Sequence, residues 1–294
     1  MKSLQAPKRL YKYRAFNVNS LRLLSEAEVY FANPEQFNDP LDCNPTIIVD
    51  VDRHALERLF IRMIGRERAR VAISEYRHSS TQYGDYKTDP TVEDHYKRIL
   101  ASRIQNILGT ELGRKGVLSL AEHWNCPLMW SHYADQHRGL CLEYDLSDGA
   151  HETIRPVRYD GPRSIKISDL IDWKMKGLST AYEVVESTYF YSKAPQWRYE
   201  KEWRLTNKGA GSCPAPVRLT GVYFGLKCDV AVETTIVKLY ANSQRPVAFY
   251  RMYPQETTFD LKKHVIDTEE VEATGLRSSA ILDFKNIFLE EPDA

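Results

Sequence analysis

Apolar residues along the chain follow the period of a strand in some segments and the period of a helix in others. Strand-like patterns cover residues 10–14, 29–32, 117–120, 139–145, 217–226, 247–253 and 258–261, and the aromatic and β-branched residues of 181–192 favour another strand. Helical spacing covers residues 53–76, 92–112, 129–137, 165–177 and 229–241, and Asn19 or Ser20 is placed to cap a helix through 21–24. These segments predict an α+β fold with a central, mostly antiparallel sheet.

The helical segments of residues 51–115 form a block that interrupts the strands. Apolar residues at Leu56, Leu59 and Phe60 recur at helical spacing, and many arginines fall on the opposite side. A polar connection over 78–89 separates two helices. We interpret this block as a helical insertion, or a lid, within a single domain of residues 1–294.

Composition and charge narrow the class of protein. The 294 residues are 43% hydrophobic, and 40 basic residues balance 40 acidic ones, so no net field attracts nucleic acid or an anionic membrane. A local basic groove is compatible with this balance. The five cysteines are scattered without a Cys-x-x-Cys pair, which favours reduced thiols. No signal segment or membrane span is visible, and we expect a cytoplasmic bacterial protein.

Glu200, Glu202 and Arg204 recur at every second position in the run 197–205. In a strand, alternate side chains share one face at steps of roughly 7 Å, so these three would project together. A solvated outer face produces the same alternation. The aromatic residues around the run support the other interpretation, in which a strand in the core presents two carboxylates to a cleft.

The segment 129–139 packs two histidines, a tyrosine and a tryptophan into eleven residues. If it is helical, Tyr133 and His137 share one side and His132 points away, so the histidines are no helical metal pair. Adding His123, Cys126 and Cys141 gives no established zinc spacing, and no metal is expected. The histidines either pin a helix onto the sheet or contact a substrate or cofactor.

Two polar groups near the N-terminus have open interpretations. Lys12 and Arg14 share one face of the first strand, where they either hold an anion or are ordinary edge charges. Asn38, Asp39 and Asp42 resemble cation ligands, but the adjacent Pro40 favours bonds from side chain to backbone in a turn. A P-loop, a dinucleotide glycine fingerprint and a nucleophile elbow are absent from the sequence, which argues against kinases, classical NTPases and Rossmann dehydrogenases.

These motifs, taken in order, resemble a bacterial family known as domain of unknown function 2971. The resemblance rests on residues 10–14, Phe37-Asn38-Asp39-Pro40 with Asp42, Met129-Trp130-Ser131-His132-Tyr133-Ala134 with His137 and Gly139, and Lys193, Trp197, Tyr199-Glu200-Lys201-Glu202 and Arg204. It spans most of the chain outside the insertion. The family name implies no reaction.

The same layout resembles the ADP-ribosyltransferase superfamily more distantly. Those enzymes have an Arg or His on an early strand, a Ser or Tyr motif in mid-chain and a Glu, often in Glu-x-Glu, on a late strand. Arg14 would match the first, Ser119 or Tyr133 the second, and Glu200-x-Glu202 the third. The resemblance implies an enzyme that cleaves NAD and transfers ADP-ribose to a protein or nucleic-acid acceptor.

Cleavage of the nicotinamide–ribose bond develops positive charge, which a carboxylate such as Glu202 would stabilise while Glu200 orients or deprotonates the acceptor. Arg14 would hold the pyrophosphate, and Tyr133 or Trp130 would stack on nicotinamide. The expected catalytic residues are Glu202, Glu200, His132 and Tyr133, and the expected NAD-binding residues are Arg14, Lys12, Tyr13, Ser119, Trp130, His137 and Arg204. Two alternatives stay open: a metal-dependent nuclease or hydrolase using His132, His137, Glu200 and Glu202, and a non-catalytic ligand-binding module in a defence or toxin context.

Overall fold

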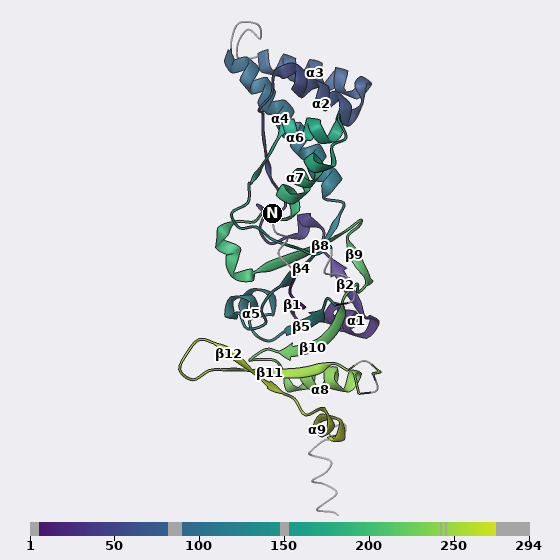
Figure 1. Ribbon diagram of the computed structural model, residues 1–294, viewed down its shortest axis with the longest axis vertical. Helices are drawn as coiled ribbons and strands as arrows, with labels where there is room; N and C mark the ends of the chain where they lie inside the picture. Colours follow the sequence, from purple (N-terminus) through teal and green to yellow (C-terminus); the bar gives the residue numbers. More distant parts are fainter. Residues whose placement is uncertain (1–5, 82–89, 148–152, 242, 245, 275–294) are drawn as a thin grey trace, which may run out of the picture. The chain divides into compact units, whose positions relative to one another are not determined.

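The computed structural model describes residues 6–81, 90–147, 153–241, 243–244 and 246–274, and Figure 1 shows the course of the chain through them. Helices and mostly antiparallel strands in this part confirm the α+β class. The chain groups into two compact units. The first contains the described residues of 1–11, 26–123 and 145–218, and the second those of 12–25, 124–144 and 219–294. The single domain expected from the sequence stays a prediction.

The sheet of the first unit is centred on β8 (Glu202–Asn207). β4 (Gly116–Ala121) pairs with β8 antiparallel over six residues, and β6 (Arg155–Pro156) pairs with it antiparallel along the opposite edge. The first part of β1 (Arg9–Arg14) pairs antiparallel with β4. Because β8 is enclosed by two neighbours, its backbone is held in register and its side chains have fixed directions.

Two smaller sheets complete the strands of the first unit. β2 (Glu28–Phe31) pairs antiparallel with β9 (Gly211–Pro214). β3 (Thr46–Ile48) pairs with β7 (Ser164–Lys166) in parallel. The chain between β2 and β3 includes the short 3-10 helix η1 (Pro34–Gln36), whose capping box is closed by Asn33. This connection brings residues 39–43 to the first unit's charged site, which is described below.

Three helices follow β3 within the range expected for the insertion. They are α2 (Arg53–Ile64), α3 (Arg66–Thr81) and α4 (Pro90–Leu112), and each packs against the other two. Asp52 caps α2 by accepting a hydrogen bond from the Ala55 backbone N–H at 2.8 Å. These helices bury one apolar side each, as their spacing predicts.

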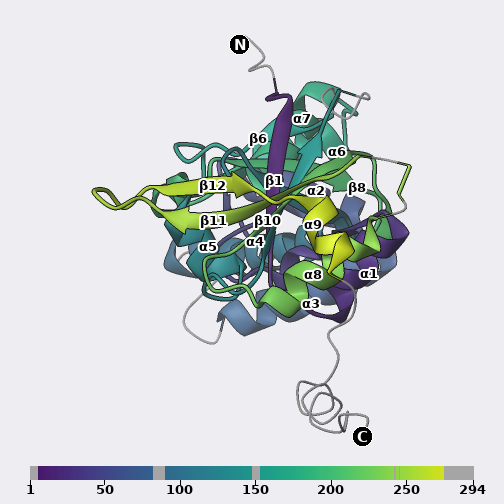
Figure 2. The ribbon, with the colours of Figure 1, turned by 90° about the horizontal axis from the view of Figure 1, so that it is seen from below.

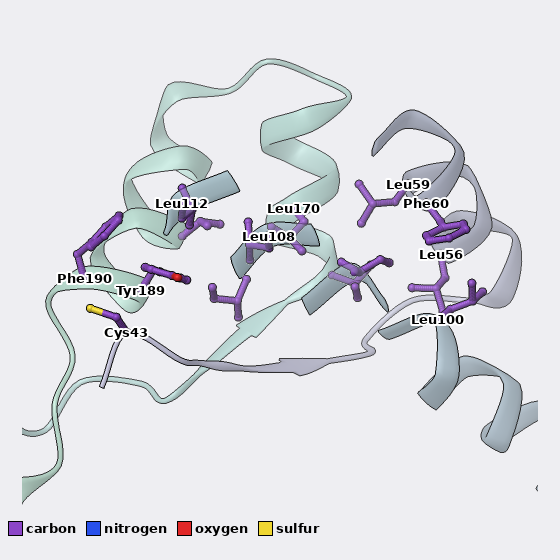
Figure 3. Close-up of a cluster of buried hydrophobic side chains, with 14 of the residues drawn as sticks. Cys43, Leu56, Leu59, Phe60, Leu100, Leu108, Leu112, Leu170, Tyr189 and Phe190 are labelled. Atoms are coloured by element: carbon purple, nitrogen blue, oxygen red, sulfur yellow. The ribbon is translucent and has the colours of Figure 1, made fainter. Parts of the chain in front are cut away.

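The helices enclose a continuous apolar cluster. Figure 3 shows Leu56, Leu59, Phe60 and Leu100 gathered at one end of the view and Cys43, Tyr189 and Phe190 at the other. Leu100 has no exposed surface. The cluster therefore runs from the helical layer to the segment that carries Cys43, which also touches the charged site.

The prediction of a strand at residues 181–192 is wrong. This segment belongs to helix α7 (Ser179–Phe190), which packs against α6 (Ile167–Lys174). Val185, Tyr189 and Phe190 all have at most 5% exposure and lie in the apolar cluster. Burial at helical spacing outweighs the strand propensity of β-branched and aromatic residues, because propensity in a sheet mainly measures packing.

The second unit combines the rest of the strands with four helices among its described residues. Its elements are the end of β1, α1 (Val18–Glu26), α5 (Pro127–Tyr133), β5 (Leu140–Asp145), β10 (Arg218–Phe224), α8 (Val230–Leu239), β11 (Ala248–Pro254), β12 (Leu261–Val265) and α9 (Thr268–Ala273). β10 and β11 are parallel, and β11 and β12 form the antiparallel hairpin seen in Figure 2.

Two boundaries in the second unit differ from expectation. The cap of α1 is Asn17, whose Oδ1 accepts from the Ser20 backbone N–H at 3.0 Å, and the Ser20 hydroxyl accepts from the Asn17 backbone N–H in return. The last strand begins at Leu261, whereas the sequence predicted a strand over 258–261. Thr258 and Asp260 instead bond to each other in the turn that precedes it.

The helix predicted over 129–137 ends at Tyr133. Asp135, Gln136 and His137 have φ of 47°, 53° and 71°, which places three successive residues in the left-handed region. Gly139 follows this turn. Only a glycine fits there, because a Cβ at this position would lie 2.2 Å from the backbone oxygen of Arg14. The expected shared side of Tyr133 and His137 is therefore wrong.

We expect Leu100→Ala to lower the free energy of unfolding by about 2–5 kcal/mol, because the truncation leaves a cavity in the apolar cluster. Val71→Ala on α3 is the matched control, since Val71 is 60% exposed. Chemical denaturation of both variants measures the difference. Equal losses would contradict the assignment of the insertion's core.

Candidate functional site

The centre of the charged site is the guanidinium of Arg204, which has no exposed surface. Its NH1 and NH2 donate to the two carboxylate oxygens of Asp42 at 2.9 and 2.6 Å. Nε and NH2 donate to the two oxygens of Glu202 at 2.7 and 3.0 Å. NH1 also donates to the backbone oxygen of Phe190 at 2.7 Å and lies 3.5 Å from Sγ of Cys43. One planar cation thus fixes two carboxylates bidentately.

Lys193 adds a second buried cation and a third carboxylate. Its Nζ donates to Glu200, and also to Oε2 of Glu202 at 3.1 Å. The distance from Nζ to Oδ2 of Asp42 is 3.5 Å. We call Asp42, Lys193, Glu200, Glu202 and Arg204 the charge cluster. Each of its side chains is at most 6% exposed.

The expected ladder of three residues on one strand is wrong for Glu200. Residues Pro195–Glu200 form a 3-10 helix, η3, with Pro195 at its start, and Lys201 follows with φ of 45°. β8 begins only at Glu202, so Glu202 and Arg204 alone share a face. Glu200 still reaches the charge cluster, because the left-handed turn at Lys201 brings it to the same cation.

The two sides of β8 are both buried, which excludes a solvated outer face for this strand. Trp203 and Leu205 are 5% and 7% exposed on the side away from the charge cluster. Ser119 of β4 lies opposite Arg204 in the sheet, and its side chain hydrogen-bonds to Glu202. The carboxylates are therefore core groups.

Opposite charges set the protonation of Glu202 and Lys193. Burial would raise the pKa of Glu202, but the Arg204 guanidinium and the Lys193 ammonium hold it well below its usual value. Burial would lower the pKa of Lys193, yet the carboxylates of Glu202, Glu200 and Asp42 raise it well above its usual value. Glu202 is consequently an anion and Lys193 a cation at neutral pH.

The turn around Asp39 positions Asp42. The Asp39 Oδ1 accepts from the Leu41 backbone N–H at 2.9 Å, as the turn interpretation predicts, and the Asp42 backbone N–H donates to the Asp39 backbone oxygen at 3.1 Å. The Asp39 Oδ2 also accepts from Nε1 of Trp197 at 2.8 Å, which ties this turn to η3. Sequence reasoning kept Asp42 as a turn residue and missed its ion pair with Arg204.

A cavity of about 300 Å³ borders the charge cluster. Its lining residues include Cys43, Tyr159, Gly161, Ser192, Lys193 and Pro195. The Tyr159 hydroxyl accepts from the Glu202 backbone N–H at 2.9 Å, so Lys193 and Tyr159 both join the cavity wall to Glu202. The Ser192 hydroxyl is buried and has no hydrogen-bond partner among the described residues.

Sequence reasoning did not identify this cavity. Its walls come from three separate segments of the chain. Of the residues that line it, the sequence motifs included only Lys193. Cys43 offers no nucleophile, because burial raises the pKa of its thiol far above the usual value. A ligand would instead meet the hydroxyls of Tyr159 and Ser192 and the ammonium of Lys193.

The predicted site residues are divided between the two units. Glu200, Glu202, Arg204 and Ser119 lie together in the first unit. The others lie in the second unit: Lys12, Tyr13, Arg14, Trp130, His132, Tyr133 and His137. Convergence of the two groups on one cleft stays a prediction.

Several of the second group have contacts within their own unit. Trp130 has no exposed surface, donates from Nε1 to the Trp124 backbone oxygen at 2.7 Å, and meets the ring of Tyr13 edge-on at 5.3 Å. The His137 ring stacks on Trp130 at 6.1 Å. Burial and the nearby Lys227 lower the pKa of His137, and its Nδ1 is buried without a partner in the described part of the chain. His132 is exposed.

Within the part of the chain that the structure describes, no group of three or more His, Cys, Asp or Glu side chains is arranged to hold an ion. All five cysteines are free thiols. Among the same residues, no helix is both long enough and apolar enough to cross a membrane.

The Glu202 carboxylate predicts an acid-sensitive stability. Because its pKa is lower in the folded state than in the unfolded chain, its contribution is present above about pH 4.3 and is lost as the pH falls further. We expect Glu202→Gln to reduce the free energy of unfolding by about 3–5 kcal/mol at pH 7, since Arg204 loses one charged partner. The reduction should shrink at pH 3. Denaturation of both proteins at the two pH values tests this, and a reduction that is independent of pH would contradict it.

A comparison with protein-family models matches residues 129–205 to a family described as "Protein of unknown function (DUF2971)". No curated protein and no solved structure matches the chain. The matched segment begins at α5 and ends within β8, so it includes Lys193, Glu200, Glu202 and Arg204. The match supports the resemblance to this family of unknown function in the segment that supplies most of the charge cluster.

Proposed function

We propose that this chain is an ADP-ribosyltransferase-like enzyme that cleaves NAD and transfers ADP-ribose to an acceptor. The observation that carries the proposal is a fixed, ionised carboxylate, Glu202, which lies beside Ser119 and is joined to a cavity wall by Tyr159 and Lys193. The serine beside a glutamate agrees with the mid-chain and late-strand positions of the superfamily that the sequence resembles.

The chemistry of Glu202 follows from its low pKa. A carboxylate that stays ionised at neutral pH is a poor proton acceptor, but it can stabilise positive charge. Departure of nicotinamide leaves an oxocarbenium-like ribose, and a preorganised negative charge lowers the free energy of that transition state. Arg204 would position Glu202, since it holds both carboxylate oxygens in place.

The reacting end of NAD would occupy the cavity beside Lys193. Its volume of about 300 Å³ lies at the lower limit of small-molecule sites, so it has room for one end of the dinucleotide. The Ser192 hydroxyl, which has no hydrogen-bond partner among the residues that the structure describes, is suited to the carboxamide of nicotinamide, which both donates and accepts hydrogen bonds.

Other roles in this proposal rest on the resemblance. Glu200 would orient or deprotonate the acceptor, which is a protein or a nucleic acid. Arg14, with Lys12, would hold the pyrophosphate, and Tyr133 would contact nicotinamide. These assignments require the second unit to contribute to the same site.

A ligand-binding module without turnover is the second candidate. It is favoured by the hydrogen bonding of Glu202. Both of its carboxylate oxygens already accept from Arg204 or Lys193, and its side chain is 6% exposed. A charge that is fully engaged in this way serves to shape a binding site. Nicotinamide release separates the two candidates, because only the enzyme turns NAD over.

We expect Glu202→Gln to reduce nicotinamide release by roughly 100-fold or more, since it removes the stabilising charge and keeps the shape. Glu186→Gln is the matched control. Glu186 is also a buried carboxylate of the first unit, 6% exposed, and is paired with Lys115 at 2.8 Å. It should lose comparable stability and retain turnover within a few fold of the wild type.

The assay measures nicotinamide release and labelled ADP-ribose transfer below the melting temperature of both variants. Equal turnover by Glu202→Gln and the wild type would exclude the electrostatic role, and an equal loss in Glu186→Gln would assign the effect to folding. NAD binding by the wild type without turnover would select the binding module.

A further inference from the structure

Five arginines are concentrated at the junction of α2 and α3. Residues 58–70, which we call the arginine segment, contain Arg58, Arg62, Arg66, Arg68 and Arg70 against one acidic residue, Glu67. All five arginines are exposed. The chain as a whole has no net charge, so this segment is a local positive centre with a formal charge of +4 in thirteen residues.

The choice of arginine over lysine is specific to these helices. α2, α3 and α4 contain nine arginines and one lysine, Lys97. Lysine and arginine would serve equally well to keep an exposed helix surface hydrated. A guanidinium, however, presents a planar set of donors that matches two phosphate oxygens, and it is more weakly hydrated than an ammonium.

Intramolecular contacts account for other arginines of the insertion. Arg77 pairs with Glu57 at 2.8 Å, and the Arg103 guanidinium lies 5.5 Å from the centre of the Tyr76 ring. Within the described part of the chain, Arg66, Arg68 and Arg70 have no ion pair of this kind. Among the described residues, the fold thus provides partners for Arg77 and Arg103 but no ion pair for these three.

The arginines at the start of α3 lie where a positive charge works against the stability of this helix. Arg66 and Arg68 lie in the first turn of α3 (Arg66–Thr81), where the helix dipole is positive and a cation costs roughly 0.3–1 kcal/mol. The repulsion between Arg66 and Arg70, one turn apart, adds to this cost. A residue set that destabilises its own helix is better explained by a bound partner than by folding.

We propose that the arginine segment binds the phosphate backbone of a nucleic acid. Charge complementarity identifies the partner, because a polyphosphate chain can contact several exposed guanidiniums of this short segment and releases its counterions on binding. The contact is to phosphate and is independent of base sequence. This inference does not rest on the proposed NAD chemistry, since binding is measured without NAD.

The test uses the full chain and labelled single-stranded DNA and RNA of about 30 nucleotides, a length that exceeds the usual site of one binding module. Fluorescence polarisation gives Kd over a range of salt concentrations. The wild type should bind both strands, and affinity should fall steeply with salt. The triple variant Arg66→Gln/Arg68→Gln/Arg70→Gln should bind at least about 10-fold more weakly and flatten the logarithmic salt slope by about 2, because each lost phosphate contact removes roughly 0.7.

A matched control removes the same charge elsewhere. Lys208, Lys227 and Lys262 are exposed, and their combined change to Gln should leave Kd and the salt slope close to the wild type. The melting temperature of the arginine triple variant should equal or exceed that of the wild type, which separates binding from folding. Equal Kd for the arginine triple variant and the wild type would overturn the proposal. Displacement of the labelled strand by poly-glutamate as effectively as by polynucleotide would assign the surface to an acidic protein instead.

Discussion

The buried guanidinium of Arg204 is the interaction on which the rest of the first unit's site depends. It connects a turn at Asp42, a strand at Glu202 and the end of α7 at the Phe190 backbone oxygen. Three segments therefore meet at one side chain, and the turn at Asp42 is 162 positions away from Arg204 in the sequence. Because the cation is fully buried, each of its donors must have an acceptor, and the acceptors define where these segments lie.

The same requirement gives the site its chemistry. A buried arginine needs carboxylates, and the Glu202 carboxylate stays ionised because the cation is there. Lys193 then offsets part of the remaining negative charge and forms part of a cavity wall. A structural ion network thus places a permanent anion close to a space of ligand size. The proposed stabilisation of a cationic sugar uses this anion, whereas the arginine segment on α2 and α3 offers the opposite charge to a different partner.

Local patterns predicted the parts of the fold that depend on neighbouring residues. Helical spacing around Leu56 located the insertion, and alternation located β4, β5 and the pair Glu202 and Arg204. The segment 181–192 was mistaken for a strand because its β-branched residues are buried by tertiary packing in α7. The early end of α5 depends on three left-handed residues, which no periodicity signals.

The site was predictable in its residue types but not in its connections. Glu200, Glu202 and Arg204 were identified as a group, yet Asp42 was assigned to a turn, because its partner lies 162 positions away. The cavity was missed for the same reason, since its walls come from separate loops and only the folded chain joins them. Ion pairing and pocket formation are long-range properties, whereas propensity and alternation are local ones.

The most direct measurement is a crystal structure of the protein with a non-hydrolysable NAD analogue. The account predicts that the nicotinamide riboside end lies in the cavity lined by Tyr159, Ser192 and Lys193, with the anomeric carbon facing Glu202. Binding of the analogue away from this cavity, or a cavity that stays empty at saturating analogue, would contradict it.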